Sequence, residues 1–173
     1  MRKNKHLLFA LAASPRFRDI KINYHVSKSD NNEEKQFSAT TFILNNVCCY
    51  LGDGTVYVAY RGTDNTIVGW KEDFNMAFVC PIPSQIEGAS YVNKVANLIP
   101  HKLFIGGHSK GGNIAIYASA FAKQEVKNRI INVYNNDGPG FCEDVIKTAE
   151  YQEIMPKTHT YIPQSSIIGR LMN

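Results

Sequence analysis

The residues best suited to chemistry lie at positions 107–111, whose sequence Gly-His-Ser-Lys-Gly matches the pattern Gly-x-Ser-x-Gly. Glycines two positions either side of Ser109 allow a turn so sharp that bulkier neighbours would collide, and the serine hydroxyl then projects from it. An apolar strand precedes the motif and a helix-like stretch follows it, which favours Ser109 as a nucleophile that attacks carbonyl carbon. An ordinary glycine-rich turn is the simpler alternative, and a phosphate-binding loop fits poorly because Gly-x-x-x-x-Gly-Lys-Ser/Thr is absent.

A nucleophilic serine usually works with an acid that follows it in the chain. Asp137 follows the strand expected at residues 130–134, after two asparagines, and begins the turn Asp-Gly-Pro-Gly. Sites in open α/β sheets form at the carboxyl ends of strands, so this position suits a catalytic carboxylate. The alternative is that Asp137 only shapes the turn through its side chain.

The base is harder to find, because none of the five histidines has the expected place. His6 and His25 precede the motif, and His101 opens the strand that leads to the serine, at its far end. His108 is next to the serine, with a side chain that should point away, and His159 lies within or before a later strand. We therefore expect this chain to lack its catalytic base.

The hydrophobic pattern predicts an α/β fold with a mostly parallel sheet, flanking helices and an antiparallel N-terminal hairpin. The expected strands are residues 20–26, 39–44, 55–60, 102–106, 130–134 and 158–162. Residues 49–51 pair with 55–60 around an Asp-Gly turn, and residues 27–35 form a polar loop. The expected helices are residues 84–99, 111–126 and 141–154.

Charge and composition exclude several classes of protein. The chain has 173 residues and a net charge of +4. Residues 1–28 hold seven Lys and Arg against Asp19, leaving twelve basic and fourteen acidic residues elsewhere, so no nucleic-acid-binding face is indicated. No apolar run approaches the ~18–20 residues that a transmembrane helix needs. Residues 1–13 resemble a signal peptide, but a helix ending before Pro15 fits as well.

The four cysteines, Cys48, Cys49, Cys80 and Cys142, show no zinc-ligand spacing. Buried, reduced thiols in a cytoplasmic protein are the expected arrangement. No metal or organic cofactor is implied.

Three segments give the chain a resemblance to the α/β-hydrolases of the class 3 lipase kind. Residues 58–64 (Val-Ala-Tyr-Arg-Gly-Thr-Asp) with 69–73 (Gly-Trp-Lys-Glu-Asp) match the family's turn and Trp-x-x-Asp stretch. Residues 106–115 match its serine motif, and residues 134–141 resemble a bacterial subgroup known only as a domain of unknown function. Together these segments cover roughly residues 35–170.

The resemblance implies a role for each matching position. Ser109 would be the nucleophile, and the backbone N–H of Lys110 and Thr63 would hold the oxyanion. His108 and Trp70 would contact substrate, although Trp70, where the family's lid begins, is equally explained as a packing indole. The family's usual acid position falls near residues 165–166, which are both serine here.

The resemblance also implies a serine hydrolase of esterase or lipase type that acts on a small-molecule or lipid ester. In the family the base follows one further strand, and this sequence stops before it. We therefore expect residues 1–173 to form a single, partial α/β-hydrolase domain whose last strand is missing and whose activity is impaired. An unpaired edge could lead to self-association. The alternatives are a non-catalytic α/β-hydrolase-like binding or scaffold module, and acyl transfer in place of hydrolysis.

Overall fold

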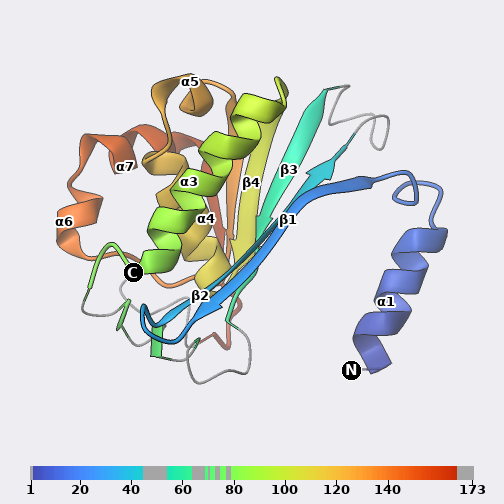
Figure 1. Ribbon diagram of the computed structural model, residues 1–173, viewed down its shortest axis with the longest axis horizontal. Helices are drawn as coiled ribbons and strands as arrows, with labels where there is room; N and C mark the ends of the chain where they lie inside the picture. The colour runs from blue at the N-terminus through green and yellow to red at the C-terminus, as the bar shows by residue number, and fades with distance from the viewer. Residues whose placement is uncertain are drawn as a thin grey trace.

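The computed structural model describes residues 2–44, 54–63, 69, 71–72, 75–76 and 79–166 (Figure 1). In these residues one sheet contains six strands in the order β1-β2-β3-β4-β5-β6. The strands are β1 Lys21–Asp30, β2 Lys35–Ile43, β3 Thr55–Tyr60, β4 Lys102–His108, β5 Ile130–Asn136 and β6 Thr158–Tyr161. β1, β2 and β3 pair antiparallel, while β3 to β6 pair parallel, so the predicted mixed sheet is confirmed.

The helices that connect the parallel strands lie on one side of the sheet (Figure 1). The sheet advances in a single direction from β3 to β6, and right-handed crossovers then place every connecting helix on the same face. These helices are α3 Pro83–Leu98, α4 Lys110–Ala120, α5 Gln124–Lys127, α6 Glu143–Ile146 and α7 Ala149–Ile154, followed by the 3₁₀ helix Met155–Lys157.

The hydrophobic core fills the space between the sheet and helices α3 and α4. Val56 and Val58 of β3 and Leu103 and Ile105 of β4 are fully buried there, at alternate positions along each strand. The two helices cross closely at Gly88, where an added Cβ would lie only 2.6 Å from Ile114 Cγ2. This core is what fixes β4 and α4 relative to each other, and so fixes the turn between them.

The opposite face of the sheet carries a row of aromatic rings. Tyr134 of β5 stacks on Tyr57 of β3 and on Phe104 of β4, with ring centroids 6.4 Å and 6.3 Å away. His159 of β6 stacks on Tyr134 from the other side at 5.6 Å. Helix α1, Arg2–Ala13, lies on this side of the molecule, apart from the main body (Figure 1). No described helix is both long and apolar enough to cross a membrane.

The N-terminal hairpin is longer than the sequence suggested, and the predicted loop at residues 27–35 is wrong. β1 continues to Asp30, and its polar residues are accommodated because it is an exposed edge strand. Only residues 31–34 turn, held by Asp30 Oδ1, which accepts the backbone N–H groups of Asn32 and Glu33 at 2.8 Å and 3.2 Å. β3 pairs with β2, while the strand predicted at residues 49–51 lies outside the described residues.

Two predicted helices are each divided in the structure. Residues 111–126 form α4 and α5, because the chain turns after Phe121 and the Lys123 N–H binds the Asn93 side chain of α3 at 3.0 Å. Residues 141–154 form α6 and α7, because Thr148 caps a new helix by accepting the Tyr151 N–H at 3.2 Å.

The cysteines are described only in part, since Cys48 and Cys49 lie outside the described residues. Cys80 and Cys142 are half-buried free thiols next to each other. Burial, followed by the neighbouring Cys142 thiol, raises the pKa of Cys80 to about 12.

Candidate active site

Ser109 occupies a strained turn between β4 and α4. Its backbone has φ 56° and ψ −130°, a conformation that residues with a side chain rarely adopt. The Ser109 N–H donates to the Asn136 carbonyl of β5 at 2.9 Å, and its own carbonyl accepts the Gly112 N–H at 2.8 Å. The serine is thus held at the carboxyl end of the sheet and at the N-terminus of a helix.

The glycines around Ser109 are required by backbone contact. A Cβ on Gly107 would lie 2.4 Å from the Gly111 carbonyl group, and a Cβ on Gly111 would lie 2.3 Å from the Tyr60 carbonyl oxygen. The ends of β3 and β4 and the start of α4 therefore meet with no space for side chains. This contact explains why the sequence pattern places glycine two residues before and two residues after the serine.

The turn after β3 lies directly beside Ser109. A Cβ on Gly62 would be 2.6 Å from the His108 carbonyl oxygen and 3.4 Å from the Ser109 Cβ. Thr63 follows at once and is half-buried. On the other side, Lys110 is the first residue of α4, where backbone N–H groups have no partner within the helix and the helix dipole is positive. The two predicted oxyanion donors therefore belong to segments that adjoin the serine.

The Lys110 side chain points into the protein and forms a buried ion pair that the sequence did not reveal. Its Nζ lies 2.9 Å from Glu72 Oε2, with 0% and 1% of the two side chains exposed. The Lys110 Nζ also donates to the Gln36 carbonyl and to Gln36 Oε1, both at 2.9 Å. These buried contacts fix the position of Lys110, and therefore also the position of its backbone N–H next to Ser109.

Glu72 links that ion pair to two further parts of the chain. Its carboxylate accepts the Gln36 N–H of β2 at 2.9 Å and the Ser84 N–H of α3 at 3.0 Å. Glu72 lies in the Gly-Trp-Lys-Glu-Asp segment, whose Trp70 lies outside the described residues. A buried ammonium group needs a charged partner, which Glu72 supplies here from a distant part of the chain.

Asp137 follows β5 at the same end of the sheet, with φ 60°. Its N–H donates to the Tyr161 carbonyl of β6 at 2.8 Å, and its Oδ1 accepts a hydrogen bond from the Ser166 hydroxyl. Position 166 is next to where the lipase resemblance places an acid. The Asp137 carboxylate therefore lies beside the segment that contains position 166, although Asp137 itself follows the preceding strand, β5.

The loop that carries Asp137 is joined to α4 by the buried amide side chain of Asn113. Asn113 Nδ2 donates to the carbonyls of Pro139 and Gly140 at 3.1 Å and 2.9 Å. An added Cβ on Gly138 would lie 2.8 Å from the Ser109 carbonyl oxygen, so the loop touches the serine's own backbone. The sequence did not indicate Asn113 as a positioning residue.

A cavity of about 580 Å³ opens at this edge of the sheet, beside the serine turn. Its walls come from the ends of β4, β5 and β6 and from the segment after β6. The lining residues are His108, Asn136, Asp137, Thr160, Tyr161, Ile162 and Pro163. His108 and Asp137 are thereby brought to one cavity, next to Ser109.

The histidines are all described, and no hydrogen bond joins any of them to Ser109. His25 lies in β1 and bonds Thr40 at 2.8 Å, and His6 lies in α1. His101 lies just before β4, at the opposite end of that strand from the serine, and a Cβ added to Gly54 would lie 3.6 Å from its Nδ1. His159 stacks on Tyr134 in the aromatic row.

A strained serine between a parallel strand and a helix, on a mostly parallel sheet, defines the α/β-hydrolase fold. Solved structures share this fold at low sequence identity. M37 lipase has a TM-score of 0.56 at 15% identity, covering 91% of this chain and 57% of that one. A fungal lipase in an inhibitor complex has a TM-score of 0.50 at 16% identity, covering 79% of this chain and 56% of that one.

The family model described as Mbeg1-like matches residues 11–173, so the chain belongs to the Mbeg1-like family. No curated protein matches the sequence. The chain spans a little over half the length of the two lipases that it resembles in structure.

Proposed function

We propose that this chain carries the nucleophile and oxyanion site of a serine hydrolase of esterase or lipase type, in a single, partial α/β-hydrolase domain. The observation that carries the proposal is the Ser109 backbone, with φ 56° and ψ −130° at the N-terminus of α4. A protein maintains such strain only where surrounding contacts impose it, and such sites cluster where residues act chemically.

In the proposed reaction the Ser109 oxygen attacks the carbonyl carbon of an ester. The Oγ proton passes to a base, the negative charge that develops on the carbonyl oxygen is held by N–H groups of Lys110 and Thr63, and the carbon–oxygen bond to the alcohol breaks. The base returns the proton to the departing alcohol, and water then releases the acid from the acyl-enzyme. One such oxyanion donor typically contributes ~2.7–4 kcal/mol.

Asp137 is the proposed acid, and His108 and Trp70 are the proposed substrate contacts. The shared cavity supports the assignments of Asp137 and His108. The histidine positions support an impaired reaction, because none of them is bonded to Ser109 or to Asp137. The expected substrate is a small-molecule or lipid ester.

A fluorophosphonate probe tests this proposal, because it reacts covalently with an activated serine. We expect slow labelling of the intact chain that is abolished by Ser109→Ala and kept by Ser119→Ala. Ser119 is a matched control because it is buried in α4, the helix that follows Ser109, and its hydroxyl donates to the Ala115 carbonyl. Labelling that persists in Ser109→Ala would refute the nucleophile assignment.

The second candidate is a non-catalytic module of the same fold, and the placement of the histidines favours it. A complete absence of labelling, with no turnover of p-nitrophenyl esters, would establish that candidate. Fast labelling would show that another group serves as the base. Where esters are cleaved, adding a competing alcohol separates acyl transfer, which yields a new ester, from hydrolysis.

A further inference from the structure

The N-terminal helix exposes more apolar surface than any other described element. Leu7, Leu8 and Phe9 of α1 are 63%, 65% and 70% exposed, and Ile22 of the adjacent β1 is 65% exposed. From residue 7 to residue 13 every side chain is apolar, so the helix has no polar face along this stretch. A helix that is apolar all round is normally buried in a core or in lipid.

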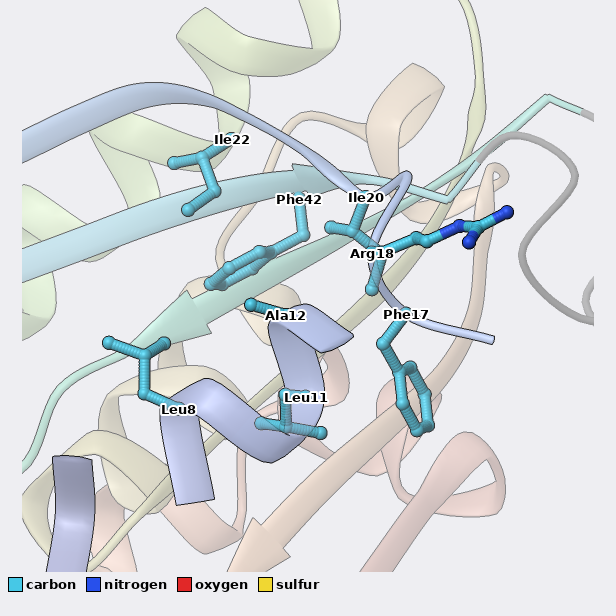
Figure 2. Close-up of a pocket in the computed structure, with 8 residues that line it drawn as sticks. All are labelled: Leu8, Leu11, Ala12, Phe17, Arg18, Ile20, Ile22 and Phe42. Carbon is cyan, nitrogen blue, oxygen red and sulfur yellow. The ribbon is translucent and has the colours of Figure 1, made fainter. Parts of the chain in front are cut away.

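α1 does not bury this surface against its own sheet. An open cavity of about 420 Å³ separates it from β1 and β2, lined by Leu8, Leu11, Ala12, Phe17, Arg18, Ile20, Ile22 and Phe42. Figure 2 shows Leu8 and Ala12 on the helix side of this space and Phe42 and Ile22 on the sheet side. The Arg18 side chain extends away from these apolar groups (Figure 2). Apolar side chains thus line both the helix and the sheet around an open space.

Basic side chains surround the same surface. Lys5, Arg16, Arg18 and Lys21 are all exposed, and Asp19 is the sole acid among residues 1–28. The remainder of the chain has a slight excess of acids. Positive charge is therefore concentrated where the exposed apolar residues are.

We propose that α1 and the neighbouring part of β1 dock on an anionic lipid surface. Leucine and phenylalanine side chains would enter the acyl region while the lysines and arginines that flank the apolar stretch contact the charged headgroups. A nucleic acid would pair with the basic side chains but would leave Leu7, Leu8 and Phe9 exposed to water. The family match begins only at residue 11, so most of α1 precedes the matched region.

Vesicle flotation with the full chain tests the proposal. We expect the protein to float with vesicles of phosphatidylcholine and phosphatidylglycerol, and at least tenfold less with phosphatidylcholine alone. Removing four charges, Lys5→Gln/Arg16→Gln/Arg18→Gln/Lys21→Gln, should weaken binding by roughly 600-fold, at roughly fivefold per basic residue. Raising salt from about 0.1 M to about 1 M should weaken it too, because the Debye length falls from roughly 10 Å to roughly 3 Å.

The apolar contribution has a matched control. Leu7→Ser/Phe9→Ser changes two exposed side chains that do not line the cavity, and it should reduce flotation at least tenfold. Ile86→Ser/Leu98→Ser changes two side chains on α3 that are 56% and 52% exposed, and it should float like the parent. All variants should keep the parent's unfolding transition, because none of the substituted residues belongs to the core cluster.

Several results would overturn the proposal. Equal flotation on neutral and anionic vesicles would exclude the electrostatic part, and equal losses in the two double variants would exclude α1. Self-association that depends on Leu7 and Phe9, with no flotation, would show that a second copy of the chain covers this surface. A native protein whose N-terminus begins after Ala13 would show that α1 is a removed leader.

Discussion

Replacing Glu72 by glutamine tests whether a buried charge holds the serine turn in place. The substitution keeps the shape of the side chain and one oxygen to accept a backbone N–H. It removes the charge that faces Lys110 Nζ at 2.9 Å, where the two side chains are 0% and 1% exposed. What remains is an ammonium group buried among neutral acceptors, the carbonyl and Oε1 of Gln36.

Removing one partner of a buried ion pair typically costs ~3–5 kcal/mol, because the other charge loses its compensation without regaining water. For a chain of this size 1 kcal/mol shifts the melting temperature by roughly 2–4 °C, so a decrease on the order of 10 °C is expected. Urea unfolding followed by circular dichroism gives the free energy of unfolding directly. The control is Glu143→Gln, which removes an exposed partner of Lys147 and should leave stability unchanged.

A double-mutant cycle makes the test specific for the ion pair. Lys110→Met combined with Glu72→Gln should be less destabilised than the sum of the single variants, with a coupling energy of ~0.5–3 kcal/mol. Because Lys110 begins α4, the Glu72→Gln variant should also react more slowly with the fluorophosphonate probe while it is still folded. A loss below ~1 kcal/mol in Glu72→Gln, or no coupling in the cycle, would refute this explanation of the turn.

Other predictions concern single features of the structure. Gly62→Ala should destabilise the fold and slow Ser109 labelling, because its Cβ would lie 2.6 Å from the His108 carbonyl oxygen; unchanged labelling would exclude that close approach. Cys80, with a pKa of about 12, should react with iodoacetamide at pH 8 at least about a hundredfold more slowly than an ordinary thiol. Peptide mass spectrometry measures the rate, and a rate equal to that of an ordinary thiol would contradict the burial of Cys80. Burial raises the pKa of Tyr60 well above its usual value, so the stability from keeping Tyr60 neutral is present below pH ~10 and is lost as pH rises further. Tyr60→Phe should therefore flatten the alkaline fall in unfolding free energy, while costing ~1 kcal/mol near neutral pH through its lost hydrogen bond. β6 is an edge strand of the described sheet, so sedimentation velocity should detect self-association, and a monomer with one sharp thermal transition would contradict it.

The sequence predicted most of the fold because the buried strands and the serine motif are local patterns. The apolar residues of β4 and β5 and the glycines around Ser109 can each be recognised in a short stretch of sequence, although Gly111 is required by its contact with the Tyr60 carbonyl of β3. The sequence was less informative where polar residues occupy regular structure. The strand expected at residues 20–26 is shorter than β1, because residues 27–30 have the composition of a loop, yet an exposed edge strand accommodates them.

The parts of the site that the sequence did not reveal depend on contacts between distant segments. Glu72 and Lys110 are separated by 38 residues, and nothing near either of them identifies the other. The contact between Asp137 and Ser166 arises because the loops after two neighbouring parallel strands meet at one edge. Such pairings follow from the order of strands in the sheet, which periodicity does not specify.

That order has a consequence for how the protein forms during synthesis. Each described strand from β2 to β6 pairs with the described strand that precedes it in the sequence. The sheet can therefore form strand by strand as the chain is synthesised. Neighbours in sequence that are neighbours in space keep loop-closure costs low, which favours fast folding. The longest interval between described strands precedes β4, because the 41 residues between Tyr60 and Lys102 must be synthesised before β4 can pair with β3. Until then the exposed edge of β3 is the part of the nascent chain most in need of protection from other strands.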